Sequence, residues 1–376
     1  MTTQCIVVGW FGYNNLGDEL MLHSLLSHLR EGDLGLTVVS GDPRQTEKIH
    51  GINSISKNWS AFERLRLAEN VIFGGGQIFS DNRARTIPLW SSILRMIRLL
   101  NKGSRIMLLN QGFEAKNKVL CKMLRSTLSR TNFISVRDSV SFGFVKALDL
   151  DVPLLSGPDI LFALSLDREG NQLVHTDDSS VTTIGVNLRP PFWWHDQSEA
   201  ERYEHVLASS LDRVIQERNA ELVFVPFRLP DKEHHSDLDF SKTIISKMKN
   251  KERAEIFVCP LDNSLFSNLM HCFRQFDLFI GTALHSLILS CKLGVPFLAF
   301  PYQKKCDIFM NDIGLANLVI KPHEMLSPDL LYKRISSALD TKNEIRSLLL
   351  SKEKTLFQDS KKAHTEPLSS LREILN

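Results

Sequence analysis

The sequence lacks the features that mark secreted, membrane-spanning and metal-clustered proteins. Its N-terminus has no basic segment followed by a long apolar run, so no signal peptide is predicted. No stretch reaches the ~18 uninterrupted apolar residues that suggest a membrane span. None of the six cysteines forms a CxxC pair or lies at zinc-finger spacing from a histidine. These absences predict reduced structural thiols, no metal and a cytoplasmic location.

A strong charge of one sign and internal repetition are absent as well. The formal net charge is only +2 over 376 residues, whereas a nucleic-acid-binding protein would carry a concentrated basic stripe. No repeat of solenoid length and no low-complexity tract occurs. A content of 43% hydrophobic and 23% charged residues predicts a globular protein, and this chain length favours two domains.

Short β-branched runs alternate with longer helical patterns along the chain. The strands expected are Ile6–Val8, Leu36–Val39, Val71–Phe73, Ile106–Leu109, Phe133–Val136, Val152–Leu155, Thr183–Leu188, Leu222–Pro226, Ile256–Cys259, Leu278–Ile280 and Phe297–Phe300. The helices expected are one from near Asp18, then Leu89–Leu100, Lys118–Leu128, Val140–Leu148, Glu199–Arg218, Leu265–Phe273 and Leu287–Leu293, with helices only after that. Apolar strands without clean alternation, separated by helices, predict parallel sheets covered on both faces.

The pattern breaks once, at the polar segment Asp167–Ser180, which is predicted to be a linker between domains. Two similar doubly wound halves predict an α/β protein with two Rossmann-like domains facing across a cleft, in a GT-B-like arrangement with parallel sheets. The expected units are residues 1–170, residues 181–340 and a helical C-terminal tail over residues 341–376.

Ligands of such sheets bind beyond the carboxyl ends of the strands, so the loops there are the first candidates. The loop after the first strand ends in Asn15, Gly17 and Asp18. Its glycines allow close backbone approach, and the helix that follows offers unpaired N–H groups to an anion. The spacing does not match the dinucleotide fingerprint GxGxxG. Asp18 fits either a helix N-cap or a catalytic carboxylate.

Two further loops in the first half are candidates. Gly75 and Gly76 belong to a run of three glycines at a strand end, followed by Asp81, so the backbone there must pass close to a ligand or to the neighbouring loop. Arg137 stands before Asp138 at the start of a predicted helix. It fits either a local salt bridge with Asp138 or a cation in the cleft.

The second half places a histidine and several cations at strand ends. Arg189 follows one strand, and a strand-to-helix junction carries Thr282, His285 and Ser286. Lys304 and Lys305 follow the next strand. A histidine near such cations predicts an anion-binding pocket with a proton carrier.

The motifs occur in an order that resembles the bacterial polysaccharide pyruvyl transferases of the cell-wall and exopolysaccharide type, from about residue 5 to residue 315. The segments that carry the resemblance are Gly12–Asp18, Gly74–Asp81, Ser135–Ser141, Gly157-Pro158-Asp159, Gly185–Pro190, Leu284-His285-Ser286 and Tyr302–Lys305. The resemblance implies a GT-B-like fold and transfer of a pyruvyl group from phosphoenolpyruvate to a sugar, with formation of a cyclic ketal. It implies phosphoenolpyruvate as co-substrate and no other cofactor. The acceptor would be a surface polysaccharide or its lipid-linked oligosaccharide precursor.

Residue by residue, Arg189 matches the arginine of the family's Gly-Val-Ser-Leu-Arg segment, and His285 the histidine of its Arg-Leu-His segment. Lys304 or Lys305 matches the lysine after the family's tyrosine. The resemblance thus implies that the second domain binds the donor through these cations, aided by the helix start near His285, with His285 as general acid. Asp18 would orient or deprotonate the acceptor on the first domain.

Two departures from the family pattern bear on this assignment. Ala283 stands where the family usually has an arginine that would grip the donor's phosphate, and Gln111-Gly112-Phe113-Glu114 replaces the usual Gly-x-Gly-Pro. A nucleotide-sugar glycosyltransferase of the same architecture and a catalytically silent glycan-binding member therefore stay open as alternatives. The lysines after Tyr302 favour the pyruvyl transferase over the glycosyltransferase. Peripheral contact with a membrane, through a lipid-linked substrate, also stays open.

Overall fold

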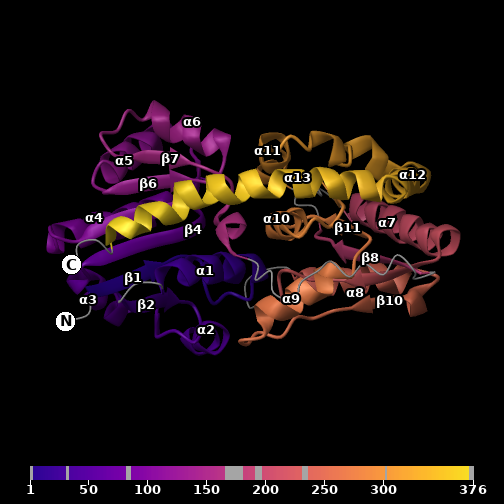
Figure 1. The fold of residues 1–376 in the computed structure, drawn as a ribbon, viewed down its shortest axis with the longest axis horizontal. Helices are drawn as coiled ribbons and strands as arrows, with labels where there is room; N and C mark the ends of the chain where they lie inside the picture. The colour runs from indigo at the N-terminus through magenta and orange to yellow at the C-terminus, as the bar shows by residue number, and fades with distance from the viewer. Residues whose placement is uncertain are drawn as a thin grey trace.

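The computed structural model describes residues 3–30, 34–81, 86–165, 181–190, 197–230, 236–300 and 303–371. In these ranges the chain forms two parallel sheets, each flanked by helices, which lie end to end along the long axis of the molecule (Figure 1). The predicted linker Asp167–Ser180 and the predicted site neighbour Tyr302 lie outside the described residues. The two-sheet α/β architecture confirms the fold class predicted from the sequence.

The first sheet has seven strands in the order β3-β2-β1-β4-β5-β6-β7, and every neighbouring pair is parallel. Its strands are β1 (Thr3–Val8), β2 (Leu34–Ser40), β3 (Ser54–Ser56), β4 (Asn70–Ser80), β5 (Arg105–Glu114), β6 (Phe133–Val136) and β7 (Leu154–Ser156). The reversal of strand order beside β1 is the switch point at which ligands of open α/β sheets bind. The loop after β1 therefore lies at the favoured place for a site.

Helices cover both faces of this sheet. They are α1 (Leu16–Leu29), α2 (Pro43–His50), α3 (Trp59–Leu67), α4 (Thr86–Leu100), α5 (Lys118–Leu128), α6 (Ser139–Ala147) and the 3₁₀ turn η1 (Ile160–Ala163). The apolar faces of α3, α4, α5 and α6 share one buried cluster with the sheet. Helix α1 and η1 share another, on the opposite face.

The second sheet has five parallel strands in the order β10-β9-β8-β11-β12. Its strands are β8 (Thr182–Asn187), β9 (Ala220–Phe224), β10 (Ala254–Ile256), β11 (Leu278–Gly281) and β12 (Phe297–Ala299). The helices around it are α7 (Gln197–Arg218), α8 (Asp237–Lys247), α9 (Leu265–Arg274), α10 (Leu284–Lys292), α11 (Lys304–Asp312) and α12 (Pro328–Asp340). Short 3₁₀ turns are η2 (Lys251–Arg253), η3 (Ala316–Leu318) and η4 (Pro322–Leu326).

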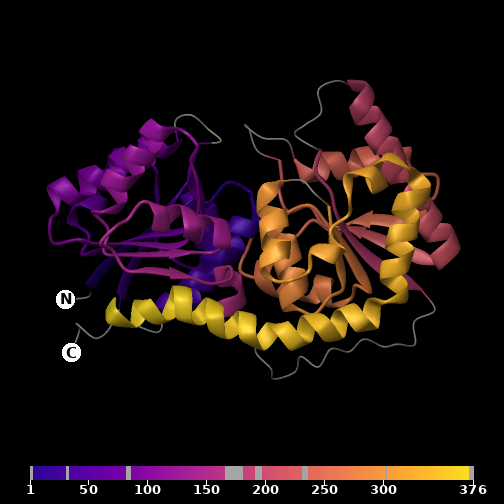
Figure 2. The same ribbon diagram turned by 90° about the horizontal axis from the view of Figure 1, so that it is seen from above.

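The C-terminal segment returns from the second half to the first. Helix α13 (Lys342–Ser360), drawn in yellow, runs along both halves of the molecule (Figure 2). It contacts α10 on one side and η1 on the other, and continues into the π-helical turn η5 (Lys361–Thr365) and the 3₁₀ turn η6 (Glu366–Leu371). The predicted helical tail is confirmed, and the structure shows that it packs against both halves of the molecule.

Local details differ from the sequence prediction. Helix α1 begins at Leu16 rather than near Asp18, because the Asn15 side chain accepts a hydrogen bond from the Gly17 N–H and caps the helix. Asp18 is therefore not the N-cap. The run Gly74–Gly76 does not end its strand, because β4 continues to Ser80 and pairs with β5 beyond a register shift.

Candidate functional site

The two halves of the molecule meet at the loop after β1. The Leu16 N–H donates to the Phe227 carbonyl at 2.8 Å, and the Leu229 N–H donates to the Asn14 carbonyl at 3.0 Å. This short antiparallel bridge brings the start of α1 against the segment that follows β9. The first glycine-rich loop thus faces the second half of the chain, as a ligand-binding loop at the interface of two domains would.

Asp159 is the centre of the polar contacts between the halves. Its Oδ2 atom lies 3.3 Å from Nη1 of Arg137, 3.3 Å from Nδ2 of Asn110 and 3.6 Å from Nε2 of His285. Arg137 follows β6, Asn110 belongs to β5 and His285 belongs to α10, so one carboxylate joins the first sheet to the second. Asp159 is buried, so the Arg137 guanidinium compensates a charge that water does not reach.

The pKa of Asp159 follows from this environment. Burial by itself raises the pKa of the carboxyl, because the charged form loses its hydration. The contact with His285, the charge of Arg137 and the Leu161 N–H outweigh this effect and hold the pKa below its ordinary value. Asp159 is therefore ionised in the folded protein, and its charge is available to hold His285.

His285 is the second residue of α10 and packs against the start of α1. A methyl group placed on Gly17 would lie 2.3 Å from Nδ1 of His285, so only glycine at this position lets the imidazole come so close. The other ring nitrogen, Nε2, faces Asp159. The side chain is 12% exposed, so the ring lies largely enclosed between the two halves. At 3.6 Å this contact is longer than a hydrogen bond, and a histidine beside a carboxylate can give or take a proton.

Asp18 is buried in the first turn of α1. Its Oδ2 atom accepts a hydrogen bond from Nδ2 of Asn15 at 2.5 Å. Burial raises the pKa of Asp18, while the charges of His285, Lys305 and Arg228 act in the opposite direction. A carboxyl with a raised pKa close to histidine and lysine is a common arrangement at sites of proton transfer.

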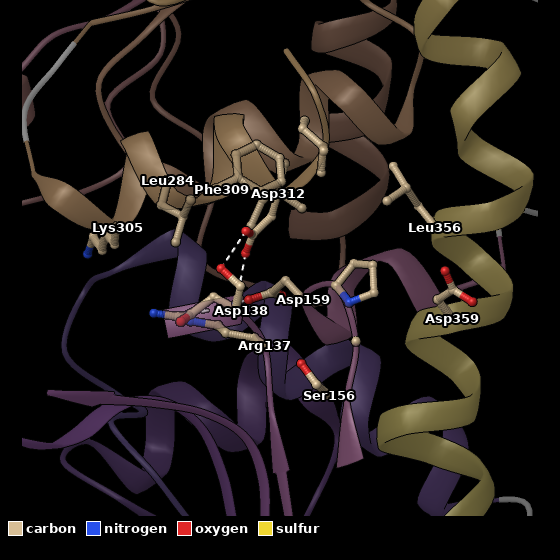
Figure 3. A pocket seen from close by; sticks show the side chains of 15 residues that line it. Arg137, Asp138, Ser156, Asp159, Leu284, Lys305, Phe309, Asp312, Leu356 and Asp359 are labelled. Atoms are coloured by element: carbon tan, nitrogen blue, oxygen red, sulfur yellow. Dashed lines mark hydrogen bonds and ion pairs between the residues drawn. The ribbon is translucent and has the colours of Figure 1, made fainter. Parts of the chain in front are cut away.

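A cavity of about 330 Å³ opens beside these groups (Figure 3). Arg137 and Asp159 line it from the first half, while Lys305, Leu284 and Phe309 line it from the second. Burial, together with the charge of Arg137, lowers the pKa of Lys305 to about 8, so an anion between these two cations would be well compensated. The cavity has the size of a small-molecule site.

A polar contact between the halves borders this cavity. The backbone N–H and the hydroxyl of Ser139 both donate to the carboxylate of Asp312, at 2.9 and 2.6 Å (Figure 3). Asp138, the other part of the predicted salt bridge, accepts from the Ser141 N–H and caps α6. The local pairing of Arg137 with Asp138 is therefore wrong, because Arg137 pairs with Asp159.

Arg189 follows β8 and forms a two-point ion pair with Asp237, the first residue of α8. Its Nε and Nη2 atoms lie 2.7 and 3.1 Å from the two carboxylate oxygens. Asp237 is buried and also accepts the backbone N–H groups of Phe227 and Arg228. This pair fixes the guanidinium at the edge of the site, where its charge acts on Lys305.

The two hydroxyl groups at the β11–α10 junction donate hydrogen bonds to backbone carbonyls of the protein. Thr282 Oγ1 donates to the Asn187 carbonyl at 2.9 Å, and Ser286 Oγ donates to the Ala283 carbonyl at 2.7 Å. Ala283 itself is buried, and its N–H donates to Asn187 Oδ1. Lys304, by contrast, is exposed as the first residue of α11. The structure thus brings Lys305 rather than Lys304 to the cavity.

The structure gives separate surroundings to the glycines of β4 and to Asp81, which follows that strand. Gly75 and Gly76 have φ of +69° and +90°, a backbone conformation that favours glycine. A methyl on Gly75 would meet Met21 of α1 at 3.0 Å, whereas Gly76 borders open space. Asp81 follows β4, and its Oδ2 accepts the N–H groups of Lys116 and Asn117, so it orders the start of α5.

One candidate that the sequence analysis did not find is Lys57. Its Nζ atom donates to the Gly9 carbonyl at 2.8 Å and lies 4.8 Å from the ring centres of both Trp10 and Tyr13. Burial lowers the pKa of Lys57 to about 8, and the charge of Asp18 acts in the opposite direction. Lys57 comes after β3, a strand of three residues that no sequence pattern indicated.

Residues at the end of α13 and in η5 contact the backbone at Asp159 and the residues next to it. His364 is fully buried, with Nδ1 2.8 Å from Ser135 Oγ and Nε2 2.8 Å from the Pro158 carbonyl. Ser360 Oγ donates to the Asp159 carbonyl at 2.9 Å. A carbonyl only accepts, so Nε2 carries the proton and Nδ1 accepts from the Ser135 hydroxyl. The neutral imidazole therefore satisfies both contacts.

This arrangement predicts that acid destabilises the protein through His364. Burial lowers the pKa of His364 from 6.5 to about 4. Between pH 6.5 and 4 this histidine is therefore protonated in the unfolded chain but stays neutral in the folded protein. The free energy of unfolding should fall by roughly 3 kcal/mol from this group between pH 6.5 and 4. Urea titrations across this pH range should show a shallower fall for His364→Gln, which keeps a donor for Pro158. Parallel curves for the two proteins would contradict a buried, neutral His364.

The fold and the site together define a protein of GT-B-like architecture, with two parallel Rossmann-type sheets and a charged cavity between them. Solved structures with this architecture cover almost the whole chain. A glycosyltransferase from Rickettsia africae matches with a TM-score of 0.58 and 13% identity, over 100% of this chain and 99% of that one. The UDP-GlcNAc 2-epimerase from Neisseria meningitidis matches with a TM-score of 0.58 and 10% identity, over 93% and 94% of the two chains. At such identities the likeness shows the fold alone.

The chain belongs to the polysaccharide pyruvyl transferase family, whose model matches residues 15–304. This match confirms the resemblance found in the sequence. A relative is the amylovoran biosynthesis protein AmsJ of Erwinia amylovora, which is 24% identical over 226 residues. The match covers 58% of this chain and 53% of the relative, so it spans about half the length of that protein.

Proposed function

We propose that this chain transfers a pyruvyl group from phosphoenolpyruvate to a sugar of a surface polysaccharide, or of its lipid-linked precursor, and forms a cyclic ketal. Family membership supports the reaction class. The observation that carries the proposal is the cavity between the halves, where Arg137 and Lys305 lie beside the Asp159–His285 pair. A small acid with a carboxylate and a phosphate needs such cations, and its reaction needs a proton donor.

The donor would lie between Arg137 and Lys305. Arg137 offers a planar fork of N–H groups that suits a carboxylate or a phosphate, and Lys305 offers a compact charge. Arg189 would add its charge from the edge, where Asp237 holds it. These cations provide the compensation that the family's arginine would give at Ala283. Binding of the donor by Arg189 and Lys304 stays a prediction from the family pattern.

His285 would protonate the methylene carbon of phosphoenolpyruvate. The C2 atom then gains oxocarbenium character, and a sugar hydroxyl forms a C–O bond to it while losing its proton to a base. Cleavage of the bond between C2 and the phosphate oxygen releases inorganic phosphate. The second hydroxyl attacks C2 and loses its proton in turn, which closes the ketal. Asp159 holds the imidazole throughout, so the acid stays aimed at one position.

Asp18 is the proposed base or orienting group for the acceptor. Its pKa is raised by burial, and a carboxylate of raised pKa takes a proton from a hydroxyl more readily than an ordinary one does. The stacked rings of Trp10 and Tyr13 belong to the loop that leads from β1 to Asp18, and Lys57 lies over both rings. The first half would thus bind the acceptor, and the donor would lie at the interface, between Arg137 of the first half and Lys305 of the second.

Release of inorganic phosphate tests this proposal against its alternatives. We expect the purified chain to release phosphate from phosphoenolpyruvate only when a suitable glycan diol is present, with one phosphate for each ketal found by mass spectrometry. Release of a nucleotide from a nucleotide sugar would instead assign a glycosyltransferase. Glycan binding without release from either donor would assign the silent family member. Boiled protein and acceptors blocked at one hydroxyl are the matched controls.

A further inference from the structure

Helix α4 is apolar on both of its faces. Its inward residues Ile87, Trp90, Leu94 and Ile97 are buried against the first sheet. Its outward face carries Leu89, Met96, Leu99 and Leu100, with exposed fractions of 55%, 40%, 68% and 50%. A helix that faces water normally has a polar outer side. A stripe of exposed large apolar side chains therefore marks a surface that contacts something other than water.

The neighbouring helix α5 extends this surface. Arg95 of α4 donates to Thr127 Oγ1 of α5 at 3.1 Å, and Arg98 donates to the Arg130 carbonyl at 3.0 Å. Val119 at the start of α5 is 69% exposed. The two helices thus form one layer, which we call the α4–α5 face. Helix α1 and the end of the C-terminal segment pack on the opposite side of the sheet and leave this face open.

The segment that forms the α4–α5 face is strongly basic, and at the border of the face Asp149 pairs with Arg125. Residues 86–130 contain nine lysines and arginines and a single acidic residue, Glu114, although the whole chain has a net charge of only +2. The exposed cations of this segment are Lys102, Lys116, Lys118, Lys122, Arg125 and Arg130. The sequence as a whole gave no hint of a basic protein, because acidic residues elsewhere balance this segment.

We propose that the α4–α5 face docks on an anionic lipid surface. Leucine and methionine side chains enter the boundary between headgroups and acyl chains, while lysines beside them attract anionic headgroups. A nucleic acid would use the cations but leave the apolar stripe in water. In the part of the chain that the structure describes, no helix is long and apolar enough to cross a bilayer.

The proposal goes beyond the proposed function, because it uses no residue of the cavity and needs no catalysis. It states where on the molecule a membrane would bind. Vesicle binding can therefore be measured with an inactive protein, and its failure would leave the pyruvyl transfer untouched.

Vesicle sedimentation with the full chain is the test. We expect the protein to pellet with vesicles of phosphatidylcholine mixed with phosphatidylglycerol and to stay in solution with phosphatidylcholine alone. The double variant Lys118→Glu with Lys122→Glu should weaken binding by about tenfold or more. Leu89→Gln with Leu99→Gln should weaken it as well, because the apolar contribution is lost. High salt should weaken binding of the wild type by screening.

Matched variants on the second half provide the control. Lys333→Glu with Lys354→Glu makes the same change of charge on exposed sites of α12 and α13, and Leu330→Gln removes an exposed leucine of α12. These variants should bind vesicles like the wild type, and circular dichroism should show that all variants are folded. Equal loss in both sets, equal binding to neutral vesicles, or no vesicle binding with retention on RNA instead would overturn the proposal.

Discussion

Replacing His285 by alanine is expected to slow phosphate release from phosphoenolpyruvate and acceptor by about 10²-fold or more, the usual scale for losing a general acid. The reason is geometric, because Asp159 and Gly17 hold the imidazole in one position between the two halves. Steady-state assays with both substrates varied will separate kcat from KM.

The matched control is His271→Ala, which removes an exposed histidine of α9. This variant should keep the activity of the wild type. If His285→Ala also turned over at the wild-type rate, the imidazole would have no part in the chemistry. A loss in KM alone, with kcat unchanged, would make His285 a binding residue rather than the acid.

Replacing Asp159 by alanine is expected to lower the free energy of unfolding by about 3–5 kcal/mol, the range for removing one partner of a buried ion pair. The change leaves the Arg137 guanidinium buried without its carboxylate and removes the partner of Asn110. It also frees His285, so activity should fall in parallel. Urea titration of the full chain at neutral pH measures the first effect.

Asp329→Ala is the control for this change. Asp329 also pairs with an arginine, Arg213, but its side chain is 74% exposed. Exposed pairs contribute about 1 kcal/mol or less, so this variant should remain close to the wild type. If Asp159→Ala lowered the free energy of unfolding as little as Asp329→Ala, the contacts of Asp159 between the halves would contribute no more than an exposed ion pair.

The architecture could be predicted from the sequence because strands buried on both faces leave a clear pattern. Apolar runs such as Ile106–Leu109 and Phe133–Val136 fall inside β5 and β6. Elements with few apolar residues escaped prediction. Helix α2 has the sequence PRQTEKIH, with one large aliphatic side chain, and β3 has three residues. Helices α3 and α8 escaped as well.

The candidate site was predictable only in part. Strand-end reasoning singled out His285, Lys305 and Arg137; the structure places His285 and Arg137 beside Asp159, and Arg137 and Lys305 at the cavity. Asp159 itself was noticed only as part of a motif, because a carboxylate between two domains depends on contacts far apart in the sequence. The supporting role of His364 was missed for the same reason, since 229 residues separate it from Ser135.

Some polar residues at strand ends proved to have partners within the protein. Thr282 and Ser286 bond the backbone, Asp81 orders the start of α5, and Arg189 pairs with Asp237. Sequence position identifies the edge of a sheet, but it does not tell whether a side chain points to a ligand or back to the chain. Packing decides this.

A crystal structure of the chain with bound phosphoenolpyruvate tests the central claim most directly. The account predicts that the phosphate or the carboxylate lies within hydrogen-bond distance of Arg137 and Lys305, with the methylene carbon facing the ring of His285. A phosphate bound away from Arg137 and Lys305, or a methylene carbon out of reach of the His285 ring, would contradict it.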